Sequence, residues 1–113
     1  MIEIYHNPRC KKSRDGLQYL RTKSMSIHII EYLKDGIDES TIKRLLGLLG
    51  VAPIDLIRTQ EEYYKTKLKG KDISDDKLIL EIVKNPKLLK RPIVVHGDKA
   101  VLAQPPELID DIF

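Results

Sequence analysis

The first 32 residues constrain the fold most, because strand, helix and strand patterns follow one another there without a break. Residues 2–5 alternate apolar and polar side chains, and residues 26–32 do so again for most of their length. Between them, residues 12–22 place Leu17 and Leu20 on one side of a helix. Two strands joined by a helix cannot form a hairpin, so this segment predicts a βαβ unit with parallel strands.

The rest of the chain predicts a run of helices, then a hairpin and a last short helix. Helical segments are expected at 39–49, 53–57, 61–68, 74–83 and 107–113. Strands are expected at 93–96 and 99–103, joined by a turn at Gly97-Asp98. The predicted fold is therefore α/β, of the order β-α-β…β-β-α, with a helical insertion at about 36–88. We expect the whole chain, residues 1–113, to form a single domain.

Composition excludes several classes of function. The chain is 42% hydrophobic and 33% charged, as in globular proteins, and its net charge of +3 is too diffuse to indicate nucleic-acid binding. No apolar run approaches membrane-spanning length, and the chain starts in a strand pattern rather than a signal peptide. A single cysteine cannot form an internal disulfide, which favours a cytoplasmic location, and with scattered histidines a metal site is not expected.

That cysteine, Cys10, lies at the first strand-to-helix junction. Free backbone N–H groups and the helix dipole favour an anion there, so the sulfur is expected as a thiolate. His6 could face the sulfur as a cation or a donor, and Ser13 could donate a hydroxyl hydrogen bond to it. The neighbouring cations are Arg9, Lys11, Lys12 and Arg14. The residues alone leave other interpretations open: a small buried cysteine, a strand-end histidine, and a serine bonded to the backbone.

Three segments carry a resemblance to a known family. They are residues 4–14 (Ile-Tyr-His-Asn-Pro-Arg-Cys-Lys-Lys-Ser-Arg), 56–58 (Leu-Ile-Arg) and 90–95 (Lys-Arg-Pro-Ile-Val-Val). The chain thereby resembles the glutaredoxin-coupled arsenate reductase family, particularly its short members, within the thioredoxin superfamily. The resemblance runs through essentially the whole chain and implies a thioredoxin-like fold with a cis Arg91–Pro92 bond.

The resemblance also implies a reaction. The cysteine attacks arsenate, and glutathione, the co-substrate, then displaces arsenite. Glutaredoxin reduces the mixed disulfide that remains, and no cofactor is bound. Cys10 would be the nucleophile, assisted by His6 and Ser13. Arg58 and Arg91 would bind the oxyanion, since the guanidinium fork suits oxyanion geometry. The family usually has a third arginine before the last helix, and Gln104 stands there in this chain, a weaker candidate ligand.

Two alternatives stay open from the sequence. Spx-type regulators share this architecture and bind RNA polymerase, although many use a Cys-x-x-Cys switch that Cys10-Lys11-Lys12-Ser13 cannot form. A glutathione-linked thiol transferase would use Cys10 alone. On sequence alone, Arg58 and Arg91 fit surface cations better than site residues, and only the resemblance assigns them to a site.

Overall fold

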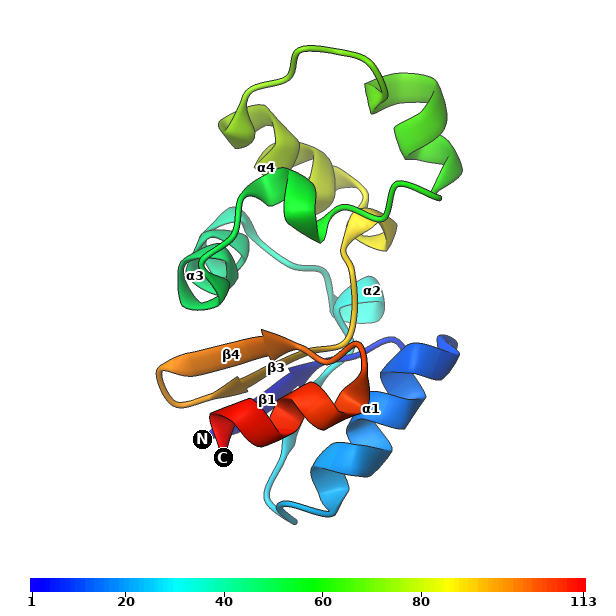
Figure 1. Ribbon diagram of the computed structural model, residues 1–113. Coiled ribbons are helices and arrows are strands. Elements are labelled where there is room, and N and C mark those ends of the chain that lie inside the picture. Colours follow the sequence, from blue (N-terminus) through cyan, green and yellow to red (C-terminus); the bar gives the residue numbers. More distant parts are fainter. The chain divides into compact units, whose positions relative to one another are not determined.

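A computed structural model describes all residues 1–113 and contains a four-stranded sheet of order β2-β1-β3-β4. Its strands are β1 (Ile2–Tyr5), β2 (His28–Ile30), β3 (Ile93–His96) and β4 (Lys99–Leu102) (Figure 1). β1 pairs with β2 in parallel and with β3 antiparallel, and β3 and β4 form the hairpin. The predicted βαβ unit and terminal hairpin are confirmed.

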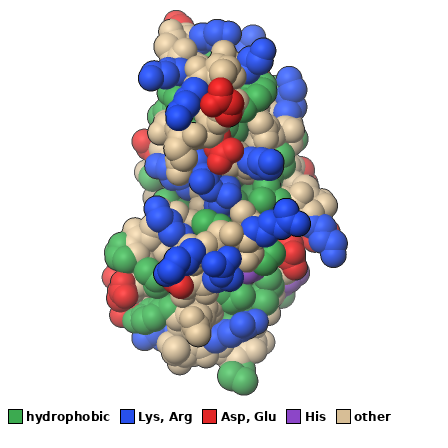
Figure 2. Space-filling model, turned by 90° about the vertical axis from the view of Figure 1, so that its right-hand side faces the viewer, with side chains coloured by type: hydrophobic (Ala, Val, Ile, Leu, Met, Phe, Trp, Pro, Cys, Tyr) green, Lys and Arg blue, Asp and Glu red, His purple; other side chains and the backbone are tan.

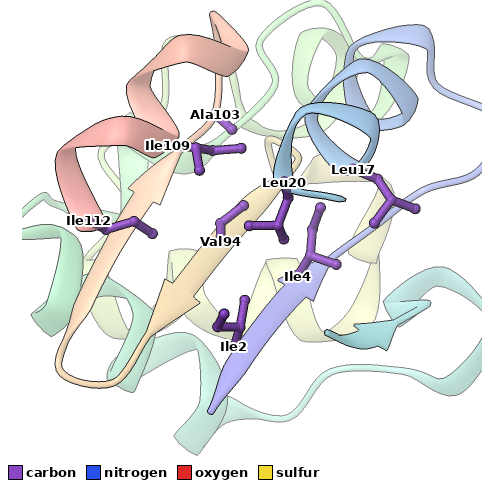
Figure 3. Close-up of a cluster of buried hydrophobic side chains, with 8 residues drawn as sticks. All are labelled: Ile2, Ile4, Leu17, Leu20, Val94, Ala103, Ile109 and Ile112. Carbon is purple, nitrogen blue, oxygen red and sulfur yellow. The ribbon is translucent and has the colours of Figure 1, made fainter. Parts of the chain in front are cut away.

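The core of this sheet lies under α1 (Lys11–Arg21) and η4 (Pro106–Ile112). Figure 3 shows the side chains that meet there from both helices, from the central strands and from the residue after β4: Ile2, Ile4, Leu17, Leu20, Val94, Ala103, Ile109 and Ile112. Each large aliphatic side chain buried in this way contributes about 1.5–3 kcal/mol. This packing fixes α1 on the sheet, and with it the position of the residue that precedes the helix.

A glycine allows α1 to approach the segment before β3 very closely. A Cβ atom at Gly16 would lie 2.5 Å from Cγ of Pro92, so no larger residue fits without movement. The Arg91–Pro92 peptide bond is cis, as predicted, and Gln104–Pro105 is a second cis bond that the sequence did not indicate. The middle of α1 and Pro92 are thus held in close contact.

The chain divides into two compact units, each described by itself. The sheet unit comprises Met1–Asp35 and Arg91–Phe113, and the helical unit comprises Gly36–Lys90. The helical unit contains α3 (Glu39–Leu49), η1 (Pro53–Leu56), η2 (Tyr64–Leu68), α4 (Asp75–Lys84) and η3 (Pro86–Leu88). Asp38 and Ser74 cap α3 and α4 by accepting hydrogen bonds from Thr41 N and Lys77 N. That the whole chain forms one domain stays a prediction.

Three elements differ from the sequence prediction. β2 keeps only three of the seven expected residues, because the Glu31 carbonyl accepts hydrogen bonds from two later N–H groups and starts the helical turn α2 (Tyr32–Asp35). Residues 64–68 wind as a π-helix, and the last helix is a 3₁₀-helix that begins at Pro106. Tyr32 is fully buried. Its burial favours the turn over a longer edge strand.

The chain is weakly basic, with 20 Lys and Arg residues against 17 Asp and Glu residues. Figure 2 shows Lys and Arg side chains spread over the face in view, with acidic and apolar side chains between them. This distribution fits the small net charge of +3. None of the helices is long and apolar enough to cross a membrane.

Candidate active site around Cys10

Cys10 occupies the N-cap of α1, in extended backbone conformation (φ −98°, ψ 123°). Backbone hydrogen bonds hold both ends of the loop that precedes Cys10. The His6 N–H donates to Ile30 O of β2 at 2.9 Å, and the Cys10 N–H donates to Asn7 O at 3.0 Å. The cysteine itself is half-buried and forms no disulfide. Its sulfur is therefore fixed in position and open to a reactant.

The surroundings of the sulfur favour the thiolate. Burial raises the pKa of Cys10, but the backbone N–H of Ser13, the Arg91 guanidinium and the backbone N–H of Lys12 act against it. The net result is a pKa below the ordinary value for a thiol. The side chain makes no regular capping hydrogen bond. The donors therefore stabilise the thiolate as aligned dipoles and a neighbouring charge.

His6, Ser13 and Asn7 form a buried polar network beside Cys10. Ser13 Oγ lies 2.7 Å from His6 Nδ1 and accepts a hydrogen bond from Asn7 N at 2.9 Å. Burial is the main cause that holds the pKa of His6 below its ordinary value, so the ring is neutral at neutral pH. This lowered pKa does not favour a cationic His6, and a contact of its ring with the sulfur stays a prediction. Ser13 contacts the sulfur through its backbone N–H, while its hydroxyl fixes the loop.

Arg91 and Gln104 are the candidate oxyanion ligands that belong to the same unit as Cys10. Arg91 is 7% exposed, and its guanidinium interacts with the Cys10 sulfur. The side-chain amide of Gln104 donates a hydrogen bond to the backbone carbonyl of Arg91. Gln104 therefore supports the backbone that carries Arg91, a role that sequence reasoning did not assign to it.

Arg58 belongs to the helical unit. Its N–H donates to Leu88 O at 2.7 Å, and its Nε lies 3.4 Å from a carboxylate oxygen of Glu61. The side chain is 20% exposed, so it is anchored rather than loose. Its assignment to the oxyanion site stays a prediction from the family resemblance.

Sequence reasoning missed two residues that shape the site. Gly16 sets the distance between α1 and the Arg91–Pro92 segment, and a glycine inside a helical pattern was the available signal. Asn7 is buried, its N–H reaches Ser13, and its Oδ1 accepts a hydrogen bond from Arg9 N at 3.1 Å. An Asn-Pro pair typically marks such a turn.

Comparison with known proteins identifies the family. The model of the ArsC family matches residues 5–112, which is nearly the whole chain. The chain belongs to the ArsC family. It is 40% identical to the uncharacterised protein YfgD of Escherichia coli K12, over 98% of this chain and 95% of that protein. It is 36% identical to an arsenate reductase of Haemophilus influenzae, over 98% of this chain and 97% of that protein.

Solved structures of ArsC proteins agree with this assignment. An arsenate reductase from Vibrio cholerae superposes with a TM-score of 0.92 at 37% identity, covering 99% of this chain and 97% of the other. The predicted thioredoxin-like α/β fold is confirmed by this likeness. No group of three or more His, Cys, Asp or Glu side chains is arranged to hold a metal ion. The groups that this site offers for chemistry are the Cys10 sulfur and the Arg91 guanidinium beside it.

Proposed function

We propose that this ArsC-family protein is a thiol-dependent arsenate reductase that uses glutathione and glutaredoxin to regenerate Cys10. The observation that carries the proposal is the pairing of a half-buried cysteine, whose pKa is lowered, with a buried guanidinium. A thiolate and a doubly charged oxyanion repel each other, so their reaction needs fixed positive charge and N–H donors at the point of bond formation. Arg91 and the first turn of α1 supply both.

The reaction has three balanced steps. The Cys10 thiolate attacks arsenic, an As–S bond forms, and one arsenate oxygen leaves as water after taking up two protons. The thiolate of glutathione then attacks the Cys10 sulfur. The electron pair of the As–S bond stays on arsenic, which leaves as arsenite, while the two sulfurs are oxidised to a disulfide. Glutaredoxin finally takes the glutathionyl group by thiol–disulfide exchange and releases Cys10.

The residues around Cys10 have different roles in this reaction. Arg91 lowers the pKa of the thiol before the reaction and offers a planar fork to the oxyanion during it. His6, Ser13 and Asn7 hold the loop that presents the sulfur. Gln104 brings no charge, so oxyanion binding is expected to be weaker than with an arginine, by roughly ten- to a hundredfold.

A coupled assay tests the proposal. Arsenate, glutathione, glutaredoxin, glutathione reductase and NADPH are combined with the protein, and arsenate-dependent NADPH oxidation is measured. Turnover that depends on the protein and disappears with Cys10→Ala supports the proposal. The proposal would be refuted if the wild type, Cys10→Ala and Gln104→Arg all showed only the background rate of NADPH oxidation.

A further inference from the structure

One pocket of the sheet unit has no role in the scheme above. It has a volume of about 370 Å³ and is lined by Lys12, Asp15 and residues 103–106. Binding sites for small organic molecules have volumes of about 300–1,000 Å³. A water molecule takes up roughly 30 Å³ in the liquid. The pocket is therefore large enough for an organic molecule and much larger than a tetrahedral oxyanion needs.

Cys10 does not line the pocket, but two of the lining residues, Lys12 and Gln104, are linked to the surroundings of its sulfur. The backbone N–H of Lys12 acts on the Cys10 sulfur, and the Lys12 side chain lines the pocket. Gln104 lines it as well and donates to the carbonyl of Arg91, whose guanidinium acts on the same sulfur. A molecule in this pocket therefore contacts the first turn of α1, the helix whose N-cap is Cys10.

The charges of the pocket point to the chemistry of its ligand. The Lys12 ammonium is exposed and makes no ion pair or hydrogen bond, whereas Lys11 beside it is paired with Asp15 at 2.8 Å. Gln104 uses its amide nitrogen in the bond to Arg91, which leaves its amide oxygen as an acceptor for an N–H group. Ala103 and two prolines form an apolar wall. A carboxylate next to an amide, on a small aliphatic body, complements these features.

We propose that this pocket binds the body of the small organic thiol that attacks the Cys10 adduct, with a carboxylate of that thiol paired to Lys12. The inference rests on the proposed function, because the reductive cycle requires an incoming thiol at this sulfur. In the proposed cycle the bound thiol, as thiolate, attacks the Cys10 sulfur of the arsenic adduct and becomes joined to Cys10. On a Cys10 mixed disulfide it attacks the same sulfur. A new disulfide forms, the old one breaks, and the leaving thiolate takes the electron pair and a proton.

Thiol exchange on a neutral adduct tests this without arsenate. Cys10 is first converted to its mixed disulfide with 4-thiopyridine, using 4,4′-dithiodipyridine. Release of thiopyridone is then followed by absorbance with N-acetylcysteine and with N-acetylcysteine amide, which differ only in the carboxylate. The ratio of the two rates is compared between variants, so the intrinsic reactivity of each thiol cancels.

The expected result is specific to one lysine. Lys12→Gln lowers the rate ratio about two- to fivefold, as loss of a partly exposed ion pair predicts, and Lys12→Arg keeps it. Arg9→Gln is the matched control, because Arg9 is also exposed and next to Cys10 but does not line the pocket. This control should leave the ratio unchanged.

Two outcomes would overturn the inference. If Arg9→Gln lowers the ratio as much as Lys12→Gln, general surface charge attracts the thiol and the pocket does not bind it. If Lys12→Gln slows both thiols equally, Lys12 acts on Cys10 itself. Since the exchange needs no arsenate, absence of arsenate reduction would refute the proposed function and leave this result intact.

Discussion

The sheet unit and the helical unit differ in what they bury. All four buried polar or charged side chains lie in the sheet unit, within four residues of Cys10 or in contact with it: His6, Asn7, Ser13 and Arg91. The buried side chains of the helical unit are all apolar. Among them are Ile42 and Leu45 of α3 and Ile82 of α4.

The difference in buried polar side chains indicates where selection for function outweighs selection for stability. Burying a polar group costs about 1–3 kcal/mol when its hydrogen bonds are not replaced, so such groups persist where chemistry needs them. Four of them around one half-buried thiolate mark that part of the sheet unit as the working part of the molecule. The helical unit follows apolar helical periodicity alone. If this comparison is correct, substitutions in the two units should fail in different ways.

The largest effect is expected at the nucleophile. Cys10→Ala removes the only thiol, so thiol exchange and arsenate-dependent turnover should fall by more than about a thousandfold. Because the side chain is small and only half-buried, thermal stability should change much less than activity. Initial rates and melting curves measured on one preparation check both parts. A variant that retains turnover would place the chemistry elsewhere.

The next largest effect is expected at Arg91. Arg91→Gln removes the cation beside the sulfur, so the pKa of Cys10 rises, and the KM for arsenate increases about tenfold or more. The midpoint of the iodoacetamide rate-versus-pH curve should move to higher pH. Lys84→Gln, an exposed change in α4, is the control and should leave that midpoint in place.

The same variant changes the pH dependence of stability. The pKa of Cys10 is lower in the folded state than in the unfolded chain, so the thiolate stabilises the fold fully above the unfolded pKa. This stabilisation is lost as pH falls through the folded pKa. The stability of the wild type relative to Cys10→Ser should therefore rise with pH across that window. In the Arg91→Gln background this rise should be smaller, as measured by urea unfolding at several pH values.

The sequence predicts the framework of both units better than the contacts inside the site. Alternation at residues 2–5 and helical spacing at 39–49 set β1 and α3, because each element buries one face of its own residues. The position of Cys10 at a strand-to-helix junction follows from the same patterns. Local patterns suffice where neighbours in the sequence decide the structure.

The contacts inside the site depend on residues that are far apart in the chain. The contact of Gly16 with Pro92 and the bond from Gln104 to the Arg91 carbonyl join segments that no local pattern connects. Ser13 was predicted to use its hydroxyl on the sulfur, but a buried histidine requires a partner, and the hydroxyl lies against that ring. Such competition for a hydrogen bond is decided only once the loop is folded.

Two serines, one in each unit, test the difference between the sheet unit and the helical unit. Ser13→Ala leaves His6 Nδ1 and the N–H of Asn7 without their partner in a buried place, so it should destabilise by about 1–3 kcal/mol and slow alkylation of Cys10. Ser74→Ala removes an exposed cap whose bond to Lys77 N is 3.3 Å long. It should cost about 0.5 kcal/mol and leave alkylation unchanged. Equal costs for the two serines, measured by urea unfolding, would remove the distinction between the units.

A pair of glycines gives the smallest effects, and they should have opposite signs. An alanine Cβ at Gly16 meets the rigid Pro92 ring at 2.5 Å, while one at Gly47 of α3 meets nothing within 4 Å. Overpacking costs about 1–3 kcal/mol, and replacing glycine by alanine inside a helix returns about 0.5–1 kcal/mol.

Gly16→Ala should therefore destabilise by about 1–2 kcal/mol, while Gly47→Ala should stabilise by about 0.5–1 kcal/mol. Only the first should also slow alkylation of Cys10, because it pushes α1 away from the segment that carries Arg91. Unfolding curves and alkylation rates of both variants check this. If Gly16→Ala stabilised the protein as Gly47→Ala does, the close approach of α1 to Pro92 would not be what sets the geometry of the thiolate.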